Sequence, residues 1–130
     1  MTRTEAGATK PLTLDQLEQA ARAPGADGMA ILRWGWALYS AGRHAEAAGA
    51  ARNAQGLTSG DPEPSFLLGM ALKGAGDKGG AVAAFGAAAA NAPGLADPVR
   101  GAMLRRLAVG QANWLQRGEW DLEPETWVRA

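Results

Sequence analysis

The chain has 130 residues, 13 basic and 13 acidic side chains, and no cysteine. A formal net charge of zero argues against a general nucleic-acid binder, which needs an excess of Lys and Arg to displace counterions. The lack of cysteine excludes disulfides, thiolate metal sites and thiol catalysis. Alanine dominates the apolar residues, so we expect one domain of helices that approach each other closely.

Residues 1–12 are polar, rich in small side chains and without periodicity, which predicts a disordered N-terminal tail. The start of the chain lacks the apolar core of a signal peptide. No segment approaches the ~20 apolar residues that span a bilayer. We therefore expect a cytoplasmic protein.

Helical patterns follow one another through residues 13–130, the expected folded domain. Thr13 and Gln16 have the spacing of a capping box, and Pro24 with Gly25 stops this first helix at residue 23. The apolar stripe from Ala30 to Leu38 predicts a second helix that ends before a turn at Gly42.

Four more helices are expected at residues 43–55, 64–75, 78–91 and 98–117. Asp97 and Pro98 have the pattern of an N-cap followed by proline in the first turn, and Gly118 is the expected stop. No segment alternates between apolar and polar residues as a strand would. The sequence therefore predicts an all-α protein of about six helices in antiparallel pairs.

Two segments of the chain match each other at a spacing of 34 residues. The matched pairs are Gly35 with Gly69, Ala37 with Ala71, Leu38 with Leu72, Gly42 with Gly76, and Ala47 with Ala81. This spacing and the small, large and turn residues within it resemble the tetratricopeptide repeat family. The resemblance implies a short right-handed solenoid with clear repeats at 28–61 and 62–95. A degenerate third unit around Gly110 is expected at 97–130.

The second unit matches the family pattern more fully than the first. It has Phe85, Ala88 and Pro93 in its second helix, whereas Ala51 replaces the aromatic residue in the first unit. This replacement is expected to thin the packing between the helices of the first unit. Neither pair can bury its apolar face alone, so the units must stack.

The resemblance implies a protein–protein interaction module, an adaptor or chaperone-like scaffold that binds a peptide on the concave face of the first helices. Two interpretations of Trp36 and Phe66 stay open: they bind the partner, or a terminal helix covers them. A self-assembling structural protein is an alternative function. The expected peptide-binding residues are Met29, Arg33, Trp36, Tyr39, Phe66, Met70 and Lys73, and the family spacing also places Leu32, Ser40, Glu63 and Leu67 on this face.

We expect no enzymatic activity, cofactor or metal. His44 is the single histidine and occupies an aromatic position after the turn glycine, so a packing role is favoured over a ligand role. An acidic C-terminal segment offers the alternative of a hydrolase or metal enzyme, although a solvated acidic edge is the favoured interpretation. The carboxylates of this segment are Glu119, Asp121, Glu123 and Glu125.

Three tryptophans near the C-terminus, Trp114, Trp120 and Trp127, have two interpretations. They cap the last open helix face, as repeat arrays require, or they form the interface of a homodimer. The sequence does not identify the protein partner.

Overall fold

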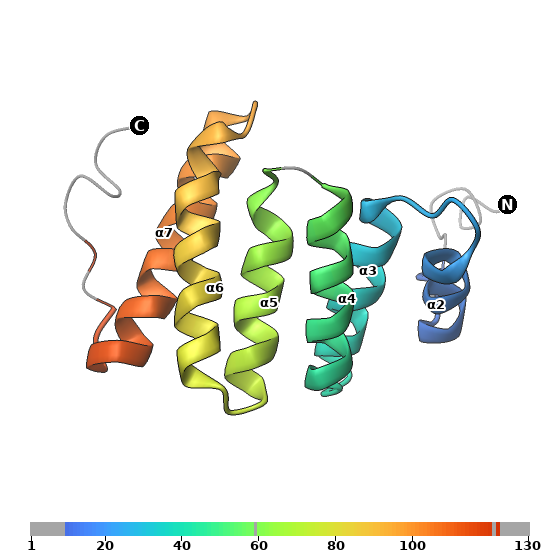
Figure 1. Cartoon of the computed structure of the whole chain (residues 1–130), viewed down its shortest axis with the longest axis horizontal. Coiled ribbons are helices and arrows are strands. Elements are labelled where there is room, and N and C mark those ends of the chain that lie inside the picture. Colours follow the sequence, from blue (N-terminus) through green and yellow to red (C-terminus); the bar gives the residue numbers. More distant parts are fainter. Residues whose placement is uncertain (1–9, 59, 121, 123–130) are drawn as a thin grey trace, which may run out of the picture.

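The computed structural model describes residues 10–58, 60–120 and 122. Its regular elements are all helices and the residues described contain no strand, which confirms the predicted all-α class. The labels follow Figure 1. The elements are α2 (Leu14–Arg22), α3 (Gly28–Ser40), α4 (His44–Leu57), α5 (Pro62–Gly74), α6 (Lys78–Asn91), the 3-10 turn η1 (Ala92–Gly94) and α7 (Pro98–Arg117).

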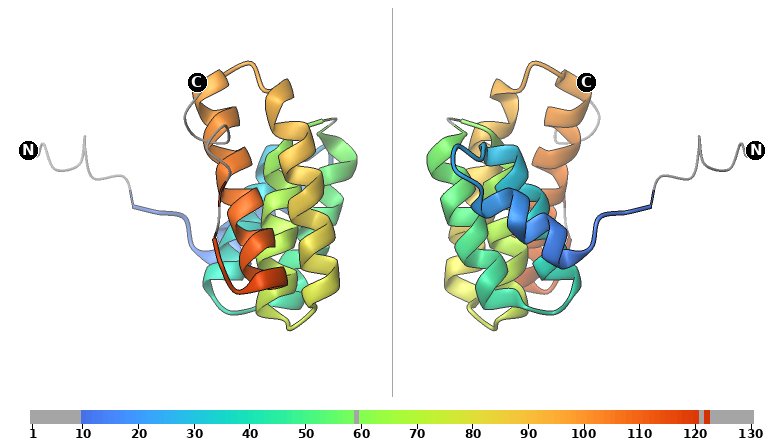
Figure 2. Two further views of the ribbon diagram at one scale, coloured as in Figure 1. Left: turned by 90° about the vertical axis from the view of Figure 1, so that its left-hand side faces the viewer. Right: turned by 90° about the vertical axis from the view of Figure 1, so that its right-hand side faces the viewer.

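The helices from α3 to α7 lie side by side and alternate in direction (Figure 1). Helix α3 pairs with α4 and α5 pairs with α6, while α5 also packs on α4 and α7 packs on α6. Two views along the long axis show α4 and α6 on one side of the molecule and α3 and α7 on the other (Figure 2). Helix α2 packs on α3 at one end of this series, and α7 lies at the other end.

The two matched segments of the sequence have the same local structure. Helices α3 and α5 are both 13 residues long, and α4 and α6 are both 14 residues long. Asp27 and Asp61, 34 residues apart, cap α3 and α5 with their side chains. After α3, the backbone N–H groups of Ala41 and Arg43 donate to the carbonyls of Ala37 and Leu38, and Ala75 and Asp77 repeat these bonds after α5 with Ala71 and Leu72.

Both turns have their predicted glycine in the left-handed region. Gly42 has φ of +80° and Gly76 has φ of +89°. A residue with a side chain is strained there, whereas glycine adopts this conformation at little cost. The expected turn positions are therefore confirmed.

Two glycines allow close approach between neighbouring helices. A Cβ on Gly69 would lie 2.6 Å from the ring of Phe85, which is fully buried. A Cβ on Gly35 would lie 2.7 Å from Leu67 and 3.3 Å from the Cβ of Ala50. The first unit has Ala51 in place of the aromatic residue, and the packing between its helices was expected to be thin. Leu67 of the next unit fills the space next to Gly35.

Most predicted helix limits agree with the structure to within a few residues. The capping box at Thr13 and Gln16 is present, and α7 begins at Pro98 and ends before Gly118 as expected. Helix α5 begins at Pro62 rather than Pro64, because the Asp61 side chain accepts a hydrogen bond from the backbone N–H of Glu63.

The expected third unit is described only in part. Helix α7 lies where the first helix of that unit was expected, whereas residues 121 and 123–130, with Trp127, lie outside the described residues. Residues 118–120 and 122 belong to no helix. Among the helices of the structure, none is both long enough and apolar enough to traverse a lipid bilayer.

The contact at Gly69 predicts opposite effects for two glycine-to-alanine changes in the second pair. Gly69→Ala should lower the free energy of unfolding by about 1–3 kcal/mol, because the buried Phe85 ring must shift to admit a methyl group. Gly86→Ala, on an open side of α6, should raise it by up to about 1 kcal/mol through helix propensity. Urea unfolding followed by circular dichroism measures both, and equal effects would contradict the close contact.

Candidate peptide-binding face

The seven predicted peptide-binding residues lie on α3 and α5. Three of them form a run of ring contacts across the two helices. The Trp36 ring lies 5.9 Å from that of Tyr39, edge to face, and 6.2 Å from that of Phe66, measured between centroids. All three residues are half-buried, and each packs against one of the two buried apolar clusters.

Glu63 is the polar centre of this face. Its Oε2 accepts a hydrogen bond of 3.0 Å from the indole Nε1 of Trp36, and its Oε1 pairs with the guanidinium of Arg100. The three residues belong to α5, α3 and α7 in turn. The half-buried Glu63 carboxylate therefore links the three helices, through the indole N–H of Trp36 and the guanidinium of Arg100.

Lys73 makes a second link between α5 and α7. Its Nζ donates to Oε1 of Gln111 over 2.8 Å. Near it, Met70 packs against the buried cluster around Phe85, whose ring also lies 5.5 Å from that of Phe66. Phe66 packs against a cluster that includes Ala108 of α7, so a terminal helix covers part of it, and its role in binding stays a prediction.

The remaining predicted residues separate into exposed and buried sets. Met29 and Arg33 are exposed on α3. Leu32 and Leu67, which the family spacing places on the same face, are buried, so that placement is wrong. Leu67 is drawn inward because Gly35 opposite it has no side chain.

Sequence reasoning missed Arg100 and Gln111, the two α7 residues that meet this face. Helix α7 is 20 residues long and does not follow the 34-residue spacing, so the repeat did not predict the positions of Arg100 and Gln111. A usable signal was their separation of 11 residues, which is about three helical turns and puts both on one side of the helix.

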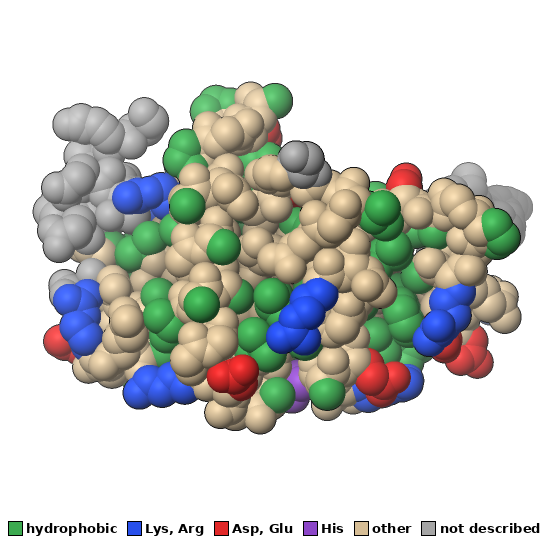
Figure 3. All heavy atoms as spheres, viewed as in Figure 1, with side chains coloured by type: hydrophobic (Ala, Val, Ile, Leu, Met, Phe, Trp, Pro, Cys, Tyr) green, Lys and Arg blue, Asp and Glu red, His purple; other side chains and the backbone are tan. Residues whose placement is uncertain are grey.

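His44 has a packing environment, in line with the role expected for it. Its imidazole lies 5.4 Å from the ring of Tyr39, and a Cβ on Gly74 would come within 2.8 Å of it. The histidine, purple in Figure 3, lies at the lower edge of that view. It thus fills the space between the α3–α4 turn and the end of α5.

The acidic segment lies mostly beyond the described residues. Glu119 is exposed, and Asp121, Glu123 and Glu125 lie outside the described residues. Within residues 10–58, 60–120 and 122, no group of three or more His, Cys, Asp or Glu side chains could hold a metal ion.

A second ion pair joins Arg43 to Glu46 at the start of α4, with Nη2 and Oε2 2.7 Å apart. The hydrogen bonds from the guanidinium lower the pKa of Glu46, and the same contact raises the pKa of Arg43. Both side chains are well exposed, so this pair differs from Glu63 and Arg100 in its access to solvent. On the side of the molecule seen in Figure 3, charged side chains of both signs are spread out without forming one large patch.

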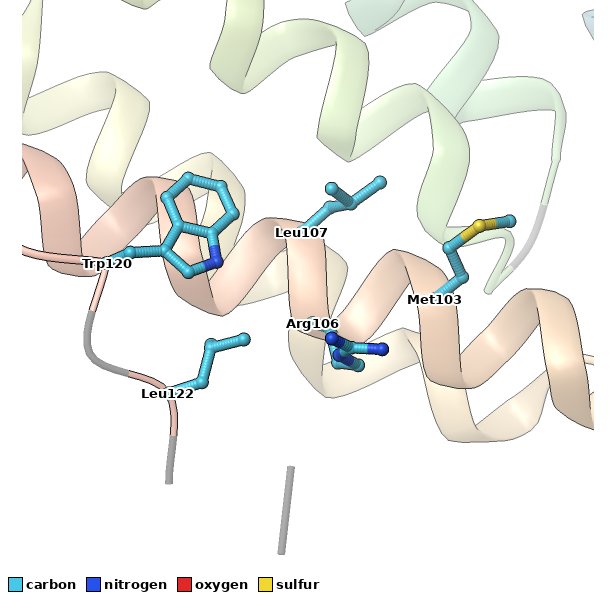
Figure 4. A pocket seen from close by; sticks show the side chains of 5 residues that line it. All are labelled: Met103, Arg106, Leu107, Trp120 and Leu122. Atoms are coloured by element: carbon cyan, nitrogen blue, oxygen red, sulfur yellow. The ribbon is translucent and has the colours of Figure 1, made fainter. Parts of the chain in front are cut away.

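A hollow of about 170 Å³ lies on the outer side of α7. It is lined by Met103, Arg106, Leu107, Trp120 and Leu122, which lie along α7 with Trp120 and Leu122 at one end of the row and Met103 at the other (Figure 4). Trp114, on the same helix, is half exposed. This hollow is separate from the face that carries Glu63.

Comparison of the chain with protein-family models, with curated proteins and with solved structures gave no match.

The links through Glu63 predict a measurable coupling between α5 and α7. In a double-mutant cycle with Glu63→Gln and Arg100→Gln, we expect a coupling of about 1 kcal/mol in the free energy of unfolding, because both groups are half-buried. The exposed pair Arg43 and Glu46 serves as the control and should couple more weakly. Urea unfolding gives both values, and a coupling at Glu63 no larger than the control would contradict the proposed link.

Proposed function

We propose that this chain is a protein–protein interaction module, an adaptor or chaperone-like scaffold that binds a peptide or protein segment on the face formed by α3 and α5. The observation that carries the proposal is the row of half-buried aromatic rings, Trp36, Tyr39 and Phe66, with exposed Arg33 beside it. Tryptophan, tyrosine and arginine are the residue types that dominate binding hot spots.

The proposal includes the architecture of a tetratricopeptide-like right-handed solenoid, with α3, α5 and α7 as the inner helices. The equal lengths of the paired helices, the repeated turn hydrogen bonds and the two glycine contacts support it. In such an arrangement each unit contacts its neighbours, and the first helices together form an extended binding surface.

The hydrogen bonds of Glu63 and Lys73 favour a preorganised face. The indole N–H of Trp36 and the ammonium of Lys73 already have partners, so a bound segment gains most from the ring faces, Met70 and the exposed guanidinium of Arg33. Side chains held in place before binding lose less conformational entropy when the partner arrives. The face therefore suits a segment with an apolar anchor and an acidic or carbonyl-rich neighbour.

A library of random peptides displayed on phage, selected against the full chain, tests this function. A selected peptide should bind the double variant Arg33→Ala, Tyr39→Ala at least tenfold more weakly than it binds the wild type, a loss of about 1.4 kcal/mol or more in binding free energy. These two side chains are exposed or half-buried, so the fold should survive, as circular dichroism can verify. Fluorescence anisotropy of the labelled peptide measures the affinities.

The matched control is Arg52→Ala, Leu57→Ala, which removes an exposed arginine and an exposed apolar side chain from α4. It should leave peptide affinity unchanged. Peptides that bind both double variants as tightly as wild type would remove the α3–α5 face from the proposal. Failure of every selected peptide to bind in solution would count against a peptide-binding function.

A further inference from the structure

Helix α7 carries an exposed apolar stripe on the side away from α6. Val99, Met103 and Leu107 follow each other at four-residue intervals, and Trp114 lies seven residues further on, so all four share one side of the helix. Their exposed fractions are 74%, 54%, 39% and 52%. Four large apolar side chains in one row form a patch of the kind that marks an interaction site.

The contact between the two helices of the second unit, a ring against a glycine, has only a partial counterpart on α7. In the second unit the Phe85 ring of α6 lies against Gly69 of α5. On α7, the Trp120 ring lies against Gly110, where a Cβ would come within 2.0 Å of the indole, but Trp120 belongs to no helix. Asn113 holds this residue by donating from Nδ2 to its carbonyl over 3.0 Å. One indole thus occupies the place where a second helix packs in the preceding pair.

The hollow beside Trp120 has room for one apolar side chain. Its volume of about 170 Å³ is comparable with that of engineered cavities, ~150 Å³, that bind benzene. Met103, Leu107 and Trp120 supply apolar walls, and Arg106 supplies a cation at the edge (Figure 4). The matching group is an apolar side chain with a carboxylate nearby.

The charge of α7 points to the same partner chemistry. Residues 98–117 include four arginines, at 100, 105, 106 and 117, and no Asp or Glu. Arg100 pairs with Glu63, so the charge that a partner would meet is that of the exposed Arg105 and Arg106. Acidic residues on a partner would complement this helix, whereas basic residues would be repelled from it.

We propose that the exposed stripe of α7 docks an acidic amphipathic helix of a partner protein. Apolar residues of that helix would cover Met103, Leu107 and Trp114, with one side chain in the hollow beside Trp120. Glu or Asp residues at its edge would pair with Arg106. This surface is distinct from the α3–α5 face and does not depend on the function proposed for that face.

Two other occupants fit the observations less well. A second copy paired through α7 about a two-fold axis would bring two arginine-rich helices together, and like charges across an interface are costly. A membrane surface does not need a hollow for a single side chain. The net charge of zero also gives the whole chain no general attraction to anionic lipid.

The test uses the full chain and a fluorescein-labelled helical peptide with Leu at positions i, i+4 and i+7, flanked by Glu. A control peptide has Lys in place of every Glu. Fluorescence anisotropy should show at least tenfold tighter binding of the Glu peptide. Met103→Glu should weaken that binding at least tenfold, and Arg106→Glu should reverse the preference toward the Lys peptide.

Leu57→Glu and Arg52→Glu are the matched controls, since both residues are exposed on α4. Neither change should alter binding, and Arg33→Ala should be equally without effect if the two surfaces are separate. Equal affinity for the two peptides, or binding unaffected by Met103→Glu, would overturn the proposal. So would a dimer in sedimentation that Met103→Glu dissociates, or binding to phosphatidylserine vesicles without binding to the peptide.

Discussion

Close helix contact at Gly35 and Gly69 is the constraint on which the rest of this structure depends. The interior contains few large side chains: the fully buried residues of α4 and α6 are five alanines and one phenylalanine, Ala47, Ala51, Ala54, Ala81, Ala88 and Phe85. Small side chains bury little apolar area each, so the helices must approach closely for packing to be complete. Glycines opposite Leu67 and Phe85 make that approach possible.

The candidate binding face follows from the same packing. Phe85 lies against Gly69, and the half-buried Phe66 ring lies 5.5 Å from the Phe85 ring and 6.2 Å from the Trp36 ring. Glu63 then joins Trp36 to Arg100 across three helices. The surface proposed for binding is thus held by the side chains that hold the helices together, and its shape depends on how α7 is docked.

Helix α7 shows what happens where the pattern of paired helices is incomplete in the described residues. Its inner side packs on α6 through Ala108, and Leu104 is also buried. Its outer side has a glycine contact with Trp120 and a row of exposed apolar residues. Among the described residues, α7 is covered mainly on one side, and this is the physical basis for the docking surface proposed there.

Local signals along the chain were enough to predict the helices, their caps and their turns. The capping box at Thr13, the glycine turns at Gly42 and Gly76 and the stop at Gly118 each depend on a few adjacent residues. The 34-residue spacing likewise indicated which helices are equivalent, and the structure has those helices at equal lengths. The candidate residues Trp36, Tyr39 and Phe66 were placed together for the same reason.

Only the tertiary structure decided which residues of that face are buried and which helix lies beside it. Leu67 is buried because Gly35, 32 residues earlier, leaves space for it, and no local sequence pattern predicts that contact. Arg100 and Gln111 reach Glu63 and Lys73 because α7 docks beside α5 outside the 34-residue register. Helix propensity and turn chemistry act over neighbouring residues, whereas these contacts join residues that become neighbours only when the helices pack.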